Sequence, residues 1–239
     1  MGGGVGISAH AAHRVVTDRS AIAMPEVGIG FFPDVGASFL LARAPGSIGI
    51  YLALTGQRIG AADAMFCKLA DVYVPADRLN ELPAVLADCR SHAQVHAGID
   101  GLSTAPGPAR LPNQREWIDG CYGGSDELEH IIESLRRCRA DGAEAALEVM
   151  SKASPTSLKV TLRNLRSAAA FDRVEQSFAQ DYRIALACIA GHDFIEGIRA
   201  AVIDKDRKPR WRPDTIEAVT RDIVDRHFRP VGDQELSFE

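Results

Sequence analysis

The stretch AMPEVGIGFFPDVG, residues 23–36, carries two carboxylates on a segment rich in glycine and proline. Three glycines and two prolines between Pro25 and Gly36 are typical of a loop rather than of a helix or strand interior. Glu26 lies between Met24 and an apolar run, so we expect apolar surroundings for its carboxylate. Such surroundings raise the pKa of a carboxylic acid and suit it to proton transfer near neutral pH.

Asp34 stands eight residues after Glu26, immediately before a segment of helical periodicity. One interpretation makes Asp34 the N-cap of that helix, with its side chain accepting a backbone hydrogen bond. The other makes it a second functional carboxylate. Two carboxylates on one glycine-rich loop are more suggestive of a site together than either is alone.

The chain opens with three successive glycines, Gly2, Gly3 and Gly4, followed by a run of small residues. Glycines at a helix start allow backbone amides to approach a ligand closely, and the helix dipole adds partial positive charge there. This arrangement suits a developing oxyanion, although a tight turn without ligand contact is the alternative. A dinucleotide fingerprint does not fit, because no strand precedes the glycines and Ile7 occupies the last position of that pattern.

Short β-rich runs and short helices alternate around this loop. Clusters of β-branched residues predict short strands at 13–17, 21–24 and 72–74. Helical spacing of apolar residues predicts helices at 37–44, 48–54, 61–67 and 79–89, the second of them capped by Gly56. Together these elements predict an α/β fold.

Residues 97–124 hold six glycines and three prolines and show no sustained period. We therefore expect a linker there, between a core domain at 1–96 and a helical region at 125–239.

Three features mark the helices of this region. Asp126 and Glu129 resemble a capping box, Ser154 is expected to cap a helix that begins at Pro155, and an apolar stripe over 174–189 stops at Gly191.

The composition is that of an ordinary globular protein and excludes several classes of function. Of 239 residues 46% are apolar, and 27 basic against 32 acidic side chains give a net charge of −5. An acidic balance argues against a nucleic-acid groove. No apolar run approaches the roughly 18 residues needed to cross a bilayer, and the first residues lack a signal-peptide pattern. We expect a soluble chain that binds neither nucleic acid nor membranes.

The five cysteines are widely spaced and form no CxxC pair, so we expect reduced and mostly buried thiols. His92 and His96 have a helical spacing that would allow them to share a metal, but no carboxylate or cysteine accompanies them in a patterned position. We expect two solvated helix residues and no metal site.

Several separated blocks, in the right order, resemble the 3-hydroxyisobutyryl-CoA hydrolase branch of the crotonase (enoyl-CoA hydratase/isomerase) superfamily. The blocks are MGGGVGIS, AMPEVGIGFFPDVG, LTGQRI with GAADA and LAD, SPTSLKVTLRNL, and GHDFIEGIRAAVIDKDRKPRW. The likeness runs from Met1 to about Phe228, and PEVGIGFFPDVG combined with FIEG and DKD is its discriminating combination. The resemblance implies part of a crotonase-like ββα spiral core followed by a C-terminal helical region.

The resemblance also implies roles for individual residues. Gly3 would supply one of two amide hydrogens that bind the thioester oxygen. Glu26 would act on the acyl carbon, either by activating water or by direct attack to give an anhydride. Asp34 would contact a substrate hydroxyl or deliver a proton to the leaving sulfur. Lys205 would approach the adenine and phosphate end of coenzyme A, whereas Glu196 is interpreted as a polar contact that fixes a helix end.

One departure separates this branch from its relatives. Hydratases of the superfamily place a second catalytic glutamate at the position of Gly6, so the resemblance disfavours addition of water across a double bond. Thioester hydrolysis needs only a polarised carbonyl and one placed base. The implied reaction is hydrolysis of a short 3-hydroxyacyl-CoA thioester. The preferred substrate is 3-hydroxyisobutyryl-CoA, an intermediate of valine breakdown. Coenzyme A is part of this substrate, and the resemblance implies no separate cofactor.

Two alternatives stay open, namely an enoyl-CoA hydratase or isomerase and a non-catalytic fragment that associates with crotonase-fold protomers. The family's fold begins well before the position of Met1, so the resemblance implies an N-terminally truncated chain with impaired activity. Its expected partners are an acyl-CoA and either further copies of itself or a missing N-terminal fragment. The expected compartment is the cytoplasm, or the mitochondrial matrix for a eukaryotic source.

Overall fold

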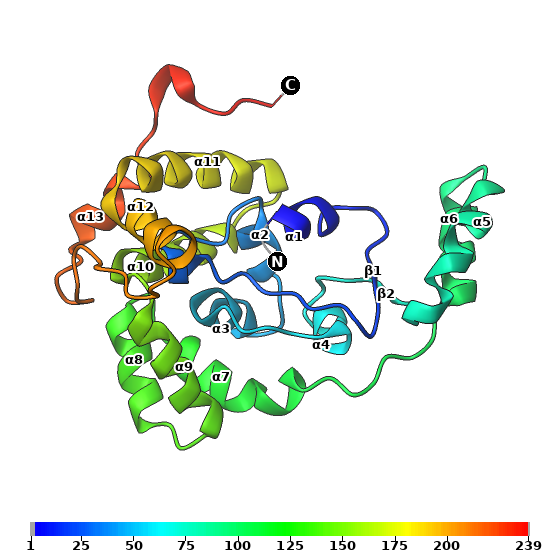
Figure 1. Cartoon of the computed structure of the whole chain (residues 1–239), viewed down its shortest axis with the longest axis horizontal. Coiled ribbons are helices and arrows are strands. Elements are labelled where there is room, and N and C mark those ends of the chain that lie inside the picture. The colour runs from blue at the N-terminus through cyan, green and yellow to red at the C-terminus, as the bar shows by residue number, and fades with distance from the viewer. Residues whose placement is uncertain (1–2, 239) are drawn as a thin grey trace.

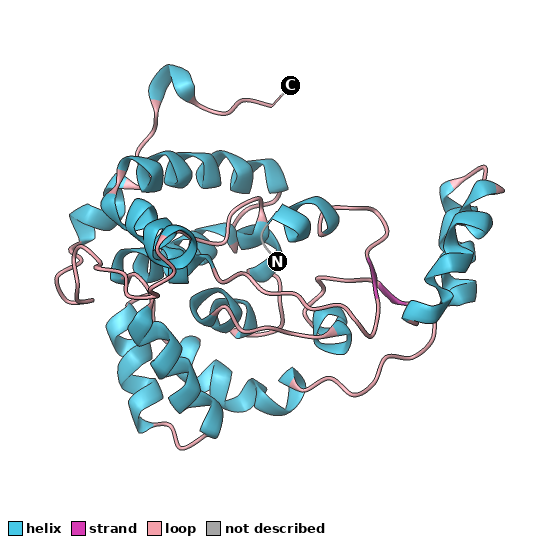
Figure 2. Cartoon of the chain, viewed as in Figure 1, coloured by secondary structure: helices cyan, strands magenta, loops and turns pink. Residues whose placement is uncertain are grey.

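Helices make up most of the computed structural model, which describes residues 3–238 (Figure 2). Two short strands, β1 (Val15–Val16) and β2 (Val72–Tyr73), pair in parallel, with Val15 opposite Val72. Helices lie between the two strands in the sequence, as a parallel connection requires. The prediction of an α/β fold is confirmed in this strongly helical form.

The strand expected at 21–24 does not form. Ile22 makes an isolated antiparallel bridge with Ile59 through two hydrogen bonds of 2.9 Å. Alanine contributes little to strand formation, and Pro25 has no amide hydrogen with which to extend the pairing. The strands expected at 13–17 and 72–74 are present and shorter than predicted.

The first half of the chain contains short helices, four of which follow the positions predicted at 37–44, 48–54, 61–67 and 79–89. The helices of this half are α1 (Gly3–Ser8), α2 (Ala37–Leu41), α3 (Ile48–Thr55), α4 (Ala61–Phe66), α5 (Leu82–Ala87), α6 (His92–Leu102) and α7 (Arg115–Tyr122). Single 3-10 turns lie at η1 (Glu26–Ile29), η2 (Ala76–Glu81) and η3 (Leu111–Gln114). Gly56 ends α3 in a left-handed conformation, as predicted.

The second half contains the longer helices. They are α8 (Leu128–Arg137), α9 (Asp141–Lys152), α10 (Pro155–Ala168), α11 (Val174–Ala190), α12 (His192–Ile198) and α13 (Arg221–Arg226). A π-helical turn, η4 (Arg199–Ile203), continues α12, and a 3-10 turn, η5 (Gly232–Gln234), lies near the end of the chain.

Helix α3 forms the centre of the hydrophobic core, and all its residues are buried. A helix that is apolar on every side must be covered on every side, and α2, α7, α9 and α10 pack against it (Figure 1). Close approach of α2 depends on Gly49, where an added Cβ would lie 1.8 Å from the carbonyl oxygen of Leu41.

The description of residues 97–124 as a structureless linker is wrong at both ends. Helix α6 runs to Leu102, and α7 buries Ile118 and Tyr122 in the main core. Gly98 serves packing, since a Cβ there would lie 2.6 Å from a methyl of Val85 on α5. Figure 1 shows α5 and α6 standing apart from the other helices. The division into domains stays a prediction.

The predicted capping box at Asp126 and Glu129 is also wrong. Glu127 is the N-cap of α8, and no side-chain hydrogen bond caps this helix. The two acids form ion pairs with α10 instead, Asp126 with Arg166 at 3.0 Å and Glu129 with Lys159 at 2.6 Å. Tertiary partners therefore outweigh the local capping pattern.

Ser154 is the N-cap of α10, and Pro155 occupies the first turn, as predicted. The Ser154 hydroxyl accepts a hydrogen bond from the Ser157 amide at 3.0 Å and donates one to Asp193 Oδ2 at 2.6 Å. Ser154 is fully buried, so its two partners have no water to replace it.

We expect Ser154→Ala to lower the free energy of unfolding by about 2–3 kcal/mol, because it removes a cap and leaves a buried carboxylate oxygen unpaired. Ser91→Ala is the matched control, since Ser91 caps α6 from an exposed position and should cost about 0.5–1 kcal/mol. Urea unfolding of the two variants measures the difference. Equal losses would contradict the buried coupling of Ser154 to Asp193.

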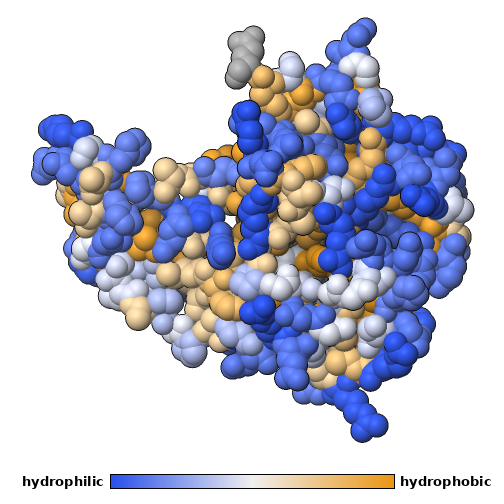
Figure 3. All heavy atoms as spheres, turned by 180° about the vertical axis from the view of Figure 1, so that it is seen from behind, coloured by the Kyte–Doolittle hydropathy of each residue, from blue (hydrophilic) through white to orange (hydrophobic). Residues whose placement is uncertain are grey.

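The surface is mostly polar, with some apolar exposure. Figure 3 shows hydrophilic residues around the periphery of the rear face and apolar residues across its middle. Large exposed apolar side chains include Ile195, Val202 and Ile203 on α12 and η4. Within residues 3–238, every helix is too short or too polar to cross a bilayer.

Candidate active site

Glu26 is the first residue of η1 and is buried, as are Met24 and Val27 beside it in the chain. Glu26 is 9% exposed, and its Oε2 atom has no hydrogen-bond partner among the described residues. Burial is the main cause that raises the pKa of Glu26 to about 7, and the charge of Asp34 adds to it. The burial of this carboxylate agrees with the prediction.

Two later segments hold η1 in place. The Val27 carbonyl accepts a hydrogen bond of 3.1 Å from the Ser154 amide, which ties η1 to the start of α10. Helix α12 packs on the other end of η1, where a Cβ at Gly30 would lie 2.2 Å from the Asp193 carbonyl oxygen. Glycine at position 30 also permits the left-handed φ of 71° that ends the turn.

Asp34 is half-buried in the turn before α2, and burial raises the pKa of its carboxyl. The N-cap interpretation is wrong, because α2 begins at Ala37 with Gly36 as its N-cap and without a side-chain cap. Only the main chain of Asp34 takes part in the start of α2, because its carbonyl accepts a hydrogen bond from the Ala37 amide at 2.9 Å. The sequence could not show that two left-handed residues would separate Asp34 from the helix.

Helix α1, which begins at Gly3, packs against this turn. A Cβ at Gly6 would lie 2.6 Å from a methyl of Val35, and His10 Nε2 donates to the Val35 carbonyl at 2.8 Å. The structure thus brings α1 together with the turn that holds Asp34. Gly2 lies outside the described residues, and the oxyanion role of the Gly3 amide stays a prediction.

Lys205 lies apart, on the exposed chain that follows η4, with a left-handed φ of 57°. Arg199 organises this chain through ion pairs with Glu196 at 2.8 Å, Asp204 at 2.6 Å and Asp206 at 2.8 Å. Glu196 also accepts the Arg210 amide at 2.8 Å, which agrees with its interpretation as a structural contact. The role of Lys205 in binding coenzyme A stays a prediction.

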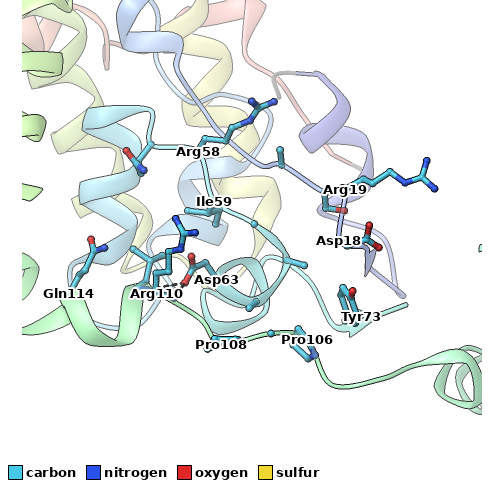
Figure 4. A pocket seen from close by; sticks show the side chains of 18 of the residues that line it. Asp18, Arg19, Arg58, Ile59, Asp63, Tyr73, Pro106, Pro108, Arg110 and Gln114 are labelled. Atoms are coloured by element: carbon cyan, nitrogen blue, oxygen red, sulfur yellow. Dashed lines mark hydrogen bonds between the residues drawn. The ribbon is translucent and has the colours of Figure 1, made fainter. Parts of the chain in front are cut away.

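Two cavities differ in their relation to the candidate site. One of about 690 Å³ is lined by residues of α4, η3 and the adjoining loops, among them Arg58, Asp63 and Arg110 (Figure 4). Neither Glu26 nor Asp34 lines it. A second cavity of about 460 Å³ has η1 in its wall, on the side formed by Pro25, Val27 and Gly28.

The part of the chain that the structure describes contains no cluster of three or more His, Cys, Asp or Glu side chains suited to a metal ion. His92 and His96 are exposed on α6, and His96 Nε2 lies 3.3 Å from Asp100. The described cysteines are unpaired thiols.

The buried carboxylates of Asp181 and Asp193 are not predicted from the sequence. Asp193, in the recognised block GHDF, accepts hydrogen bonds from Ser154 and from the Arg212 amide at 2.8 Å. Asp181 lies beneath the turn after Asp34 and accepts the Gly36 amide at 2.8 Å. Asp181 lies within the apolar stripe of 174–189, where a charged residue is unexpected. This position in the sequence could have indicated a buried carboxylate.

Comparisons with known proteins agree with the resemblance in the sequence. The family described as enoyl-CoA hydratase/isomerase matches residues 1–228. The mitochondrial 3-hydroxyisobutyryl-CoA hydrolase of Gallus gallus is 38% identical over 243 residues, and that of Homo sapiens is 36% identical over 245 residues. The alignments cover 99% and 100% of this chain but 63% of each relative, so the chain spans less than two thirds of their length.

Solved structures with the same fold carry different names. A carnitinyl-CoA dehydratase from Mycobacterium thermoresistibile has a TM-score of 0.92 and 44% sequence identity, covering 100% of this chain and 67% of that one. An enoyl-CoA hydratase from Rhodobacter sphaeroides has a TM-score of 0.90 and 40% identity, covering 100% of this chain and 68% of that one. The predicted crotonase fold is confirmed, and the chain belongs to the enoyl-CoA hydratase/isomerase family.

Proposed function

We propose that this chain carries the reacting carboxylates of an enzyme that hydrolyses a short 3-hydroxyacyl-CoA thioester, with 3-hydroxyisobutyryl-CoA as the preferred candidate. The observation that supports hydrolysis best is the buried Glu26 carboxyl, with one oxygen free of hydrogen bonds and a pKa raised to about 7. A base of this pKa exchanges protons readily at neutral pH. The names of the mitochondrial relatives supply the substrate class.

The proposed reaction uses water and two carboxyl groups. Glu26 takes a proton from a water molecule, whose oxygen attacks the thioester carbon and pushes the carbonyl electrons onto oxygen. The Gly3 amide hydrogen-bonds this oxyanion. The carbon–sulfur bond breaks as the carbonyl reforms, and Asp34 in its acid form passes a proton to the leaving sulfur. Burial raises the pKa of the Asp34 carboxyl. Direct attack by Glu26, giving an anhydride that water then opens, is the variant of the same scheme.

Hydration of an enoyl-CoA is the second candidate, because the solved structures similar to this chain are named hydratase and dehydratase. The packing at Gly6 weighs against it. A second carboxylate at that position would have to displace Val35, since even a Cβ there would lie 2.6 Å from its methyl. Coenzyme A enters both schemes as part of the substrate, and no other cofactor is needed.

The test is a pair of assays on the same protein. With 3-hydroxyisobutyryl-CoA we expect release of free thiol, and with a short enoyl-CoA we expect no change in the absorbance of the conjugated double bond. Consumption of the enoyl-CoA without thiol release would favour hydration instead. No reaction with either substrate, together with association of the chain with a crotonase-fold protein, would favour the non-catalytic fragment.

The relatives are longer than this chain, and we expect its activity alone to be weaker than theirs. Removing one oxyanion donor typically costs about 10²–10³ in turnover. The assay is therefore repeated with the N-terminal portion of a longer relative added as a separate polypeptide. Thiol release that rises on mixing would support assembly of a shared site, and unchanged release would count against it.

A further inference from the structure

The carboxylate of Asp181 lies directly beneath the turn that carries Asp34. Asp181 is on α11 and is 4% exposed. Its Oδ2 accepts the Gly36 amide at 2.8 Å, and its Oδ1 accepts Asn164 Nδ2 at 3.0 Å and the Ser38 hydroxyl at 3.3 Å. Both oxygens are therefore occupied, and one of them is bound to the turn itself.

The turn is in a conformation that the chain does not adopt freely. Val35 has a φ of 54° and Gly36 a φ of 74°, so two successive residues are left-handed. This conformation is unfavourable for a β-branched residue, and it persists only where the surroundings determine it. The bond from Asp181 to Gly36, the contact of Val35 with Gly6 and the bond from His10 are the restraints the structure offers.

The polar cluster around Asp181 is itself rigidly connected. Asn164 on α10 accepts a hydrogen bond from Gln180 at 2.6 Å, which fixes the amide that faces Asp181. Ser38 shares a hydrogen bond of 2.5 Å with Ser177, and both hydroxyls are buried. Within residues 3–238 no Lys, Arg or His forms an ion pair with Asp181. Burying a carboxylate without a cation beside it lowers the stability of the folded protein. The bond from Asp181 to the turn therefore needs an explanation other than stability.

We propose that Asp181 is a positioning residue for the reaction, which holds the Asp34–Gly36 turn so that the Asp34 carboxyl faces the leaving sulfur. The inference rests on the proposed function, because it concerns catalysis only where Asp34 delivers the proton. The C-terminal helices thereby contribute to the site without touching substrate: α11 and α10 determine the geometry of a loop that lies about 130–145 residues earlier in the chain.

Asp181→Asn tests this proposal with little change of shape. An asparagine keeps one acceptor, whereas its NH2 group would face either the Gly36 amide or the Asn164 amide, both of which are donors. We expect the Gly36 amide to exchange its hydrogen about tenfold faster, and kcat for the thioester to fall about tenfold with KM unchanged.

Ser177→Ala is the control, because it removes a buried hydrogen bond of the same cluster and leaves the bond from Asp181 to Gly36 intact. It should lower thermal stability without changing the exchange of the turn or kcat. If Asp181→Asn does not fold, Asn164→Ser removes one donor to the carboxylate and should move both measurements in the same direction by less.

The proposal is overturned if Asp181→Asn behaves like Ser177→Ala, with lower stability but wild-type exchange at Gly36 and wild-type kcat. It is supported if exchange and kcat change together and KM does not. A wild-type protein without thioesterase activity would defeat the proposed function separately. The exchange of Gly36, measured without substrate, then decides whether Asp181 holds the turn.

Discussion

Replacing Glu26 with glutamine is expected to slow hydrolysis by about 10²–10⁴ and, at the same time, to make the protein more stable above pH 7. Burial raises the pKa of Glu26 from its ordinary value of 4.5 to about 7. Between these values the unfolded chain has already released the proton that the folded chain still holds. The unfolded state then binds fewer protons, so stability falls as the pH rises through this window.

The size of the effect follows from the pKa difference. One unit corresponds to 1.36 kcal/mol, so ionised Glu26 costs the folded protein about 3 kcal/mol once the pH exceeds 7. Glutamine has a similar shape and carries no charge, so it escapes this cost. The gain in stability of Glu26→Gln should be near zero at pH 4 and grow to about 3 kcal/mol at pH 8.

Urea unfolding at several pH values measures this gain. Glu217→Gln is the control, since Glu217 is exposed and its replacement should give parallel curves for variant and wild type. Thiol release by Glu26→Gln should fall by about 10²–10⁴, the usual contribution of a general base. A variant with wild-type turnover would remove Glu26 from the mechanism. A difference in stability that does not depend on pH would show that Glu26 is not ionising in a buried site.

The sequence predicted the burial of Glu26 more successfully than the backbone setting of Asp34, and the reason is physical. Apolar residues flank Glu26 closely in the chain and predict its burial, and in the structure α3, α10 and α12 pack against the turn that it begins. The setting of Asp34 depends instead on a left-handed Val35, which β-branched residues rarely adopt and which no local pattern indicates. Contacts from α1 and α11 impose that conformation, and both are distant in the sequence.

The same distinction explains the errors in the fold. The glycine content of 97–124 predicts a loop, yet Gly98 and Gly120 both lie in helices. At Gly98, close packing against Val85 offsets the low helix propensity of glycine. The helices α3 and α10 were predicted well, since their apolar spacing, proline and capping serine act locally. Features that depend on neighbouring residues could be predicted from the sequence, whereas close contacts between distant segments could not.

The motif FIEG was recognised only as a likeness, and the structure gives it a physical role. Gly197, its last residue, lies in α12 directly against η1, where an added Cβ would be 2.1 Å from the Ile29 carbonyl oxygen. The obstacle is backbone, which cannot rotate away as a side chain does. Glu26 begins the same turn that Ile29 ends, so the contact lies three residues from the proposed base.

We therefore expect Gly197→Ala to destabilise the protein by about 1–3 kcal/mol, even though alanine favours a helix by about 1 kcal/mol over glycine. The turn has to move away from α12, and a misplacement of about 1 Å can reduce turnover by about 10². Gly120→Ala is the matched control, a helical glycine with no atom within 4 Å of the added Cβ, and it should be slightly stabilising.

Thermal unfolding and thiol release separate the two parts of this expectation. A loss of turnover at a temperature where Gly197→Ala is still folded would mean that the contact of α12 with η1 positions Glu26. Wild-type turnover together with lower stability would mean that FIEG serves packing alone. If Gly197→Ala is as stable as Gly120→Ala, the close approach at Ile29 is wrong. The FIEG motif would then need a different explanation, because it would not support the turn that contains Pro25 and Glu26.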